Sequence, residues 1–137
     1  MSGEIQLKTF RIGTMVEGET GLRVAVTRWP PRGIPKAEWK RVSGFDVWLP
    51  AVAPSAELIE RFHPQQETDP AKWKKFLAAY EKEVLGTAES RQTVALLAEL
   101  ARRMPVKIGC FCEDERHCHR SRLFELIRRM ADGDSTN

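Results

Sequence analysis

The residues of this chain that are best suited to chemistry gather in one short stretch, residues 110–120, with the sequence CFCEDERHCHR. All three cysteines, two of the three histidines and two arginines lie in it. Thiolates are nucleophiles and metal ligands, imidazoles transfer protons or bind metals, and guanidiniums bind phosphate and carboxylate. We therefore predict that the functional site lies in this stretch.

The second half of the stretch has the features of an activated thiol. Cys118 stands at the expected start of a helix, directly before His119 and Arg120. The first turn of a helix has unpaired N–H groups and the positive end of the helix dipole, which stabilise a thiolate or a bound anion. We predict that Cys118 or Cys112 is a nucleophile and that His119 is its general acid or base. These residue types alone do not decide whether the protein is an enzyme.

The same stretch supports a second interpretation, a zinc site. Cys112, Cys118, His117 and His119 together offer a tetrahedral set of sulfur and nitrogen ligands. Cys110 is a different case, because it alternates with apolar residues in a segment typical of a buried strand, where a cysteine packs as a small hydrophobe. We expect Cys110 to be mainly structural.

A proline-rich segment, residues 29–35, is the second candidate region. Its three prolines in seven residues remove backbone donors and fix φ, so a stiff loop is predicted. A stiff loop directly after a strand can hold an arginine in a pocket. We predict that Arg28 and Arg32 bind a small anionic ligand together with Glu113 and Arg120.

The elements that must position these residues follow from hydrophobic periodicity. Alternating apolar residues predict strands over residues 5–12, 22–27, 45–49 and 106–111. Apolar residues at helical spacing, between cap residues, predict helices over residues 55–62, 70–86, 89–104 and 119–130. This order predicts an α/β fold, a single three-layer, Rossmann-like domain over residues 1–131. We expect a small, mostly parallel sheet flanked by helices, and a disordered tail over residues 132–137.

The predicted fold brings the two candidate regions together. In a parallel sheet, ligands bind beyond the carboxyl ends of the strands. The loops at residues 28–35 and 112–119 both follow strands, so we expect Arg28 to face the Cys-His-Arg segment. The remaining histidine, His63, precedes a proline in a loop, and we expect no catalytic role for it.

Composition narrows the classes of function. The 137 residues carry a net charge of +3 with both signs interspersed, whereas a nucleic-acid-binding protein usually has a stronger basic excess. No apolar run reaches the ~20 residues that span a bilayer, and the N-terminus lacks the order of a signal peptide. Three clustered cysteines argue against a disulfide framework. We expect a cytoplasmic protein, and predict neither a particular cofactor nor an oligomeric state.

Two groups of residues carry a family resemblance. Cys112-Glu113 followed by Cys118-His119-Arg120 and a helix resembles the Cys-Ala/Glu…Cys-His-Arg signature of the domain-of-unknown-function 488 family. Arg28 and residues 31–33 resemble the arginine-proline element of that family after an early strand. Many members have an aspartate directly before this arginine, where the present chain has Thr27. The resemblance covers about residues 7–130 and implies an α/β fold with its site at the Cys-His-Arg element.

The leading hypothesis is an α/β domain that binds a small anionic or nucleotide-like ligand at the Cys-His-Arg loop and uses a thiol if it is an enzyme. Two alternatives stay open, a non-catalytic zinc-binding module and a nucleic-acid-associated binding protein.

Overall fold

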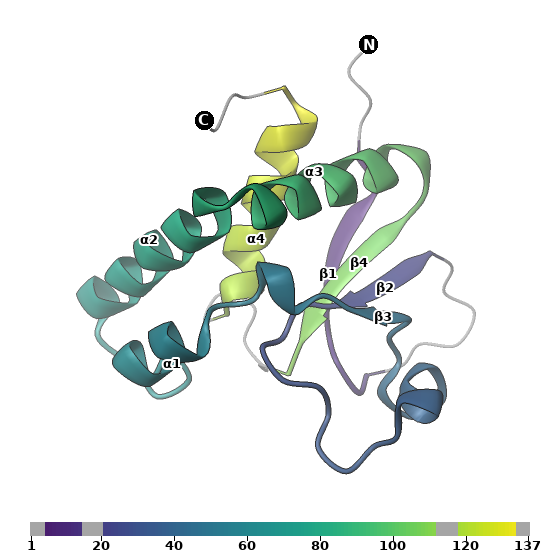
Figure 1. Ribbon diagram of the computed structural model, residues 1–137, viewed down its shortest axis with the longest axis horizontal. Coiled ribbons are helices and arrows are strands. Elements are labelled where there is room, and N and C mark those ends of the chain that lie inside the picture. Colours follow the sequence, from purple (N-terminus) through teal and green to yellow (C-terminus); the bar gives the residue numbers. More distant parts are fainter. Residues whose placement is uncertain (1–4, 15–20, 112–117, 134–137) are drawn as a thin grey trace.

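The computed structural model describes residues 5–14, 21–111 and 118–133. Its α-helices pack on one face of a sheet and shorter helical segments pack on the other face, so the fold has three layers (Figure 1). In chain order the strands and α-helices are β1 Leu7–Arg11, β2 Leu22–Ala25, β3 Val47–Trp48, α1 Ala56–Phe62, α2 Pro70–Gly86, α3 Ala88–Arg103, β4 Val106–Cys110 and α4 His119–Ala131. Each one overlaps an element predicted from the sequence, and the predicted α/β class is confirmed.

The strands form one sheet in the order β1-β4-β2-β3, and every pair of neighbours is parallel. Val106 of β4 pairs with Leu7 of β1 on one side and with Leu22 of β2 on the other. The two inner strands, β4 and β2, therefore end side by side at Cys110 and Ala25. This adjacency decides which loops meet at the carboxyl edge of the sheet.

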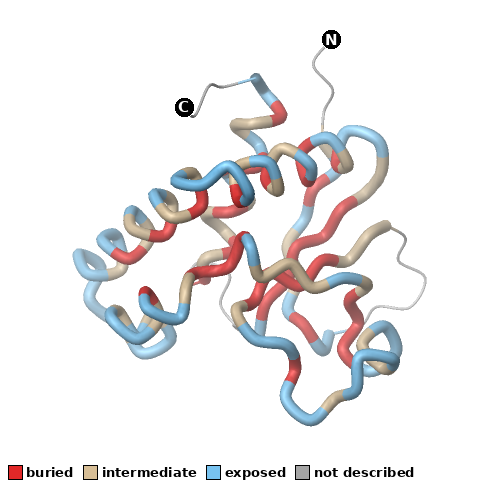
Figure 2. The backbone as a smooth tube through the Cα atoms, in the orientation of Figure 1, coloured by how far each residue is buried: buried red, intermediate tan, exposed pale blue. Residues whose placement is uncertain are grey.

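The two faces of the sheet are covered differently, although Figure 2 shows that buried residues run along its inner strands. On one face, side chains of β2 and β4 pack with residues of α2, α3 and α4 in the main core. On the other face, a smaller cluster is built from Ile12, Ala25 and Phe45, with Trp39 and Trp48 packed against it. Trp39 begins the second of three short helical segments in the described chain, Lys36–Glu38, Trp39–Ser43 and Pro50–Val52, which were not predicted from the sequence.

The alternation of β4 distributes its side chains between these two layers. Val106 and Ile108 belong to the main core, so Cys110, two residues further on, is directed to the same helical layer. Gly109 is directed to the opposite face, where an added Cβ would lie 2.5 Å from the ring of Phe10. Gly109 is therefore the residue that lets Phe10 pack across β4.

Side-chain caps set where the helices begin. The hydroxyl of Ser55 accepts a hydrogen bond from the Leu58 N–H at the start of α1. Asp69 accepts from the Ala71 N–H at the start of α2, where Pro70 occupies the first helical position, as predicted. α2 ends at Gly86, also as predicted. None of the helices in the described part of the chain is both long and apolar enough to cross a membrane.

Candidate functional site

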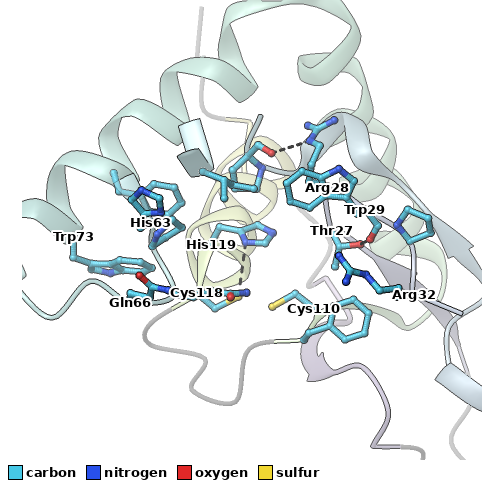
Figure 3. A pocket seen from close by; sticks show the side chains of 17 residues that line it. Thr27, Arg28, Trp29, Arg32, His63, Gln66, Trp73, Cys110, Cys118 and His119 are labelled. Carbon is cyan, nitrogen blue, oxygen red and sulfur yellow. Dashed lines mark hydrogen bonds between the residues drawn. The ribbon is translucent and has the colours of Figure 1, made fainter. Parts of the chain in front are cut away.

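A pocket of about 480 Å³ opens at the carboxyl ends of β2 and β4 (Figure 3). One wall is formed by the segment after β2, including Thr27, Trp29 and Arg32. The opposite wall comes from the end of α1, the loop after it and Trp73 of α2. Cys110 at the end of β4 and the first residues of α4 lie between the two walls, as Figure 3 shows. The pocket thus occupies the position that a parallel sheet predicts for a ligand.

Two buried cysteines contribute to this pocket. Cys110 is the last residue of β4 and 2% exposed, and Cys118 is the N-cap residue of α4 and 1% exposed. Cys118 has an extended backbone, and its side chain makes no capping hydrogen bond to the helix. Its sulfur is therefore directed to its neighbours in the pocket rather than to the first turn of α4. Cys110 is buried, as expected, and it also borders the site.

His119 links the start of α4 to the end of β2. Its Nε2 lies 2.6 Å from the carbonyl oxygen of Val26. A carbonyl oxygen only accepts hydrogen bonds, so Nε2 carries the proton and donates it. In the neutral ring Nδ1 then keeps its lone pair, and this atom lies 3.8 Å from the sulfur of Cys118. The backbone contact selects the tautomer in which His119 can accept a proton from that thiol.

The surroundings keep the His119 ring neutral. Burial lowers its pKa from the ordinary value of 6.5, and the positive charges of Arg120 and Arg28 act in the same direction. The negative charge of Cys110 and the hydrogen bond to Val26 oppose this shift but do not cancel it. At neutral pH, His119 is therefore an uncharged base.

Tyr80 supports the ring from the helical layer. Its ring meets the His119 ring edge-on, with centroids 5.4 Å apart, and its hydroxyl donates to the carbonyl oxygen of Val52 at 2.6 Å. Burial raises the pKa of Tyr80 well above its ordinary value, and the charges of Cys118, Glu83 and Cys110 add to the effect. Tyr80 therefore remains a protonated donor that fixes the position of the His119 ring.

Arg120 brings a positive charge to both sulfur atoms. The residue is only 3% exposed, and its Nη1 lies 3.1 Å from Cys110 Sγ and 4.0 Å from Cys118 Sγ. A guanidinium at these distances favours the thiolate over the thiol. The predicted site residues Cys118, His119 and Arg120 are therefore brought together, and Cys110 joins them.

The same side chains could hold a metal ion. The ligand atoms of Cys110, Cys118 and His119 all lie within 4.8 Å of one another. Two sulfurs and one nitrogen make three of the four ligands of a tetrahedral zinc site. The hydrogen bond from His119 to Val26 would orient such a ligand through its other ring nitrogen. Cys112 and His117 of the predicted set lie outside the described residues, and Cys110 is an additional candidate ligand.

Arg28 lines the pocket, but its guanidinium is engaged with the chain itself. Nε donates to the Pro54 carbonyl at 2.9 Å, and Nη2 donates to the carbonyls of Pro50 and Ala53 at 2.9 and 3.1 Å. In Figure 3 the group lies away from the sulfurs of Cys110 and Cys118. Arg28 thus ties the segment after β3 to the end of β2, and its predicted contact with a ligand stays a prediction.

Arg32 differs from Arg28 in its surroundings. It is exposed, lines the pocket, and makes no hydrogen bond or ion pair with any residue that the structure describes. The loop that carries it is held by the Thr27 hydroxyl, which donates to the Trp29 carbonyl at 2.8 Å. No described residue therefore engages the guanidinium donors of Arg32, which are available to a ligand in the pocket.

Three predicted residues, Cys112, Glu113 and His117, lie outside the described part of the chain. In turn, the structure adds pocket residues that were not predicted. His63, Gln65 and Gln66 from the loop after α1 line the pocket, and so does Trp73 of α2. Trp73 is half-buried and packs against Phe76 with ring centroids 5.1 Å apart. The rarity of histidine was the one signal in the sequence that could have singled out His63.

Comparison with known proteins identifies the family. The model of DUF488-N3a, described as the active DUF488-N3 subclade, matches residues 7–131. The chain therefore belongs to the DUF488 family, as its Cys-His-Arg element predicted. No curated protein and no solved structure matches the chain significantly.

Proposed function

We propose that this DUF488 protein is a thiol-dependent enzyme that binds a small anionic ligand in the pocket and attacks it with the sulfur of Cys118. The observation that carries the proposal is the 3.8 Å contact between Cys118 Sγ and Nδ1 of His119, whose other nitrogen is committed to Val26. A thiol next to a fixed, neutral imidazole is the arrangement from which nucleophilic cysteines react. The description of the matching subclade as active agrees with an enzyme.

The charge at the site also supports a thiolate. Arg120 lies within reach of the sulfur, and Cys118 occupies the N-cap of α4, where the helix dipole favours negative charge. The pocket gives the sulfur a route to a ligand although Cys118 is buried. These features act together, because the proton that leaves the thiol goes to His119 and the charge that stays is balanced by Arg120.

The proposed step conserves atoms and charge. Cys118 gives its proton to Nδ1 of His119, and the thiolate forms a bond to an electrophilic carbon or phosphorus of the ligand. The leaving group departs with the electrons of the broken bond and takes the proton back from Nδ1. Water then releases the adduct, with Nδ1 accepting a proton from water and returning it to the departing sulfur.

Arg32 is proposed to hold the anionic end of the ligand. Its exposed guanidinium lines the pocket and has no hydrogen-bonding partner among the described residues. A forked donor of this kind matches phosphate and carboxylate. Cys112, Glu113 and His117 remain candidate contributors from the segment before α4.

Iodoacetamide labelling of the folded protein near pH 7, followed by mass spectrometry, tests the proposal, because it reports each cysteine separately. We expect Cys118 to react well below pH 8.5, the range of an ordinary free thiol. Cys118→Ser should abolish the fast phase, and Cys110→Ser serves as the matched variant that leaves the Cys118–His119 pair in place. Labelling of Cys118 only above about pH 8.5 would refute an activated thiol.

A metal site is the second candidate function, because three donor atoms lie within 4.8 Å of one another. It predicts about one equivalent of zinc in protein purified without chelators. It also predicts that Cys110→Ser and Cys118→Ser lose the metal alike, whereas the thiol enzyme depends on Cys118 more than on Cys110. Metal-free protein whose Cys118 reacts near pH 7 would exclude this candidate.

A further inference from the structure

We infer that the wall of the pocket opposite Arg32 is a subsite for a planar heterocycle, so that the ligand is a nucleoside phosphate. The inference rests on the proposed function and names the class of its substrate. Three features carry it: the polar side chains on that wall, the aromatic rings beside them, and the position of the reactive sulfur between the two walls.

The polar part of the wall is the loop that follows α1. His63 closes α1 with a left-handed backbone, φ 45°, and the Gln66 N–H donates to the His63 carbonyl at 2.9 Å. This turn places the side chains of His63, Gln65 and Gln66 along the pocket. Within the described residues, no hydrogen bond or ion pair engages these three side chains. Their donors and acceptors are therefore available to a ligand.

A primary amide offers a donor and an acceptor side by side. Glutamine uses this pair to bind the N6 and N7 edge of adenine through two hydrogen bonds, which a plain sugar phosphate cannot provide. Gln65 and Gln66 present two such groups on one wall. The chemistry of the wall is therefore suited to the edge of a nucleobase.

Aromatic rings accompany these amides. Trp73 lies beside Gln66 and His63 in Figure 3, and its ring packs against the buried Phe76. The face of an indole ring such as that of Trp73 is a surface on which a nucleobase can stack. The pocket, at about 480 Å³, falls in the range of roughly 300–1,000 Å³ of small-molecule sites.

The two walls stand on either side of the thiol. Figure 3 shows Arg32 on one side, His63, Gln66 and Trp73 on the other, and Cys118 with His119 between them. A ligand with its anionic group at Arg32 and its ring at the glutamine wall would carry its linking atoms past the sulfur. A nucleoside phosphate has this order of parts, with the sugar between the base and the phosphate.

Isothermal titration calorimetry with defined probes tests the inference. The probes are adenosine, guanosine, cytidine and uridine 5′-monophosphates, with ribose 5-phosphate and inorganic phosphate as ligands that lack a base. We expect at least one nucleotide to bind about tenfold tighter than ribose 5-phosphate, the order of magnitude of one stacking or bidentate contact. Equal affinity for ribose 5-phosphate and all four nucleotides would overturn the inference.

Variants of the wall opposite Arg32 show whether its glutamines cause the preference for a base. Gln65→Ala combined with Gln66→Ala should remove the preference among bases and leave affinity for ribose 5-phosphate unchanged. Gln92→Ala, at an exposed glutamine of α3 outside the pocket, is the matched control and should change neither. A double variant that still discriminates among the bases as the parent protein does would contradict the subsite.

The test of the nucleobase subsite and the test of the proposed thiol enzyme can fail independently of each other. Cys118→Ser should bind the preferred nucleotide with unchanged affinity, because the base and phosphate contacts do not involve the thiol. Nucleotide binding together with an unreactive Cys118 would retain the subsite and reject the thiol enzyme. A reactive Cys118 with no preference for nucleotides would retain the enzyme and reject the subsite.

Discussion

Nε2 of His119 lies 2.6 Å from the carbonyl oxygen of Val26, so the first residue of α4 is bound to the end of β2, 93 positions earlier in the chain. This contact also fixes the position of the proton on the imidazole ring. Because the carbonyl can only accept, it assigns the proton to Nε2 and leaves Nδ1 to face Cys118. The reactivity proposed for Cys118 therefore depends on a backbone atom of the residue that directly follows β2.

Replacement of the imidazole by an amide separates the two roles of His119. His119→Gln keeps a donor near the position of Nε2 for the Val26 carbonyl but has no base at the position of Nδ1. We expect the free energy of unfolding to change by about 1 kcal/mol or less, and the alkylation rate of Cys118 near pH 7 to fall at least tenfold. Urea unfolding and timed iodoacetamide labelling measure the two effects. An unchanged labelling rate would show that His119 is not the base.

The free energy of unfolding should decrease at acid pH because of His119. The pKa of His119 is lowered in the folded protein mainly by burial, so the unfolded chain binds the proton more readily. The stabilisation is complete above the unfolded pKa of about 6.5 and is lost as the pH falls through the folded value. Urea unfolding of the parent protein between pH 7.5 and 5.5 should show this loss. His119→Gln should show a smaller decrease over the same range, and equal decreases would assign the effect to other groups.

Arg28 is predicted to matter for stability. Its guanidinium donates to the carbonyls of Pro50, Ala53 and Pro54, and removal of the side chain leaves these acceptors unsatisfied. We expect Arg28→Gln to lower the free energy of unfolding by about 2–3 kcal/mol. Arg41→Gln is the matched control, since Arg41 is exposed and, among the described residues, pairs only with Glu38, and it should change stability by less than about 1 kcal/mol. Equal stabilities of the two variants would contradict the structural role.

Arg32 is predicted to matter for ligand binding and not for stability. It is exposed and has no partner among the described residues, so Arg32→Gln should leave the midpoint of urea unfolding unchanged. Binding of inorganic phosphate, measured by calorimetry, should weaken by about tenfold, because a charge-assisted contact is lost. Arg41→Gln again serves as the control and should bind phosphate like the parent protein. Loss of stability without loss of phosphate binding would reverse the assignment.

Gly109 should not tolerate a larger side chain. A Cβ at this position would lie 2.5 Å from the ring of Phe10, closer than two carbon atoms can approach. We expect Gly109→Ala to destabilise the fold by about 1–3 kcal/mol, the typical cost of overpacking. Phe10→Leu combined with Gly109→Ala should restore part of that loss, which a double-mutant cycle by urea unfolding would measure. Additive effects of the two changes would show that the ring is not the obstacle.

Much of this protein could be predicted from local patterns. The caps at Ser55 and Asp69, the helical spacing of Phe76, Tyr80 and Val84, and the alternation in β4 all depend on neighbours within a few positions. The Cys-His-Arg element was found in the same way, because residue types that do chemistry are rare and these are adjacent. Such signals survive in a single sequence, since the contacts behind them are local or periodic.

Local sequence patterns could not distinguish the roles of Arg28 and Arg32. Both were predicted to bind a ligand, and both line the pocket, yet one donates to three backbone carbonyls and the other does not. Backbone carbonyls have no signature in a sequence, because every residue has one. The hydrogen-bonding partners of an arginine can therefore be identified only from the tertiary structure.

By itself, the sequence determined the α/β class and the element order, and it predicted a candidate site after β4, because hydrophobic periodicity and clustered chemical groups are properties of neighbouring residues. Only the tertiary structure decided that Cys110 lines the same pocket as Cys118 and His119, that the Val26 carbonyl selects the tautomer of His119, and that His63, Gln65 and Gln66 form the far wall of the pocket. These relations join residues that are far apart in the chain. They arise because the parallel order β1-β4-β2-β3 brings the ends of β2 and β4 together, where α4 begins.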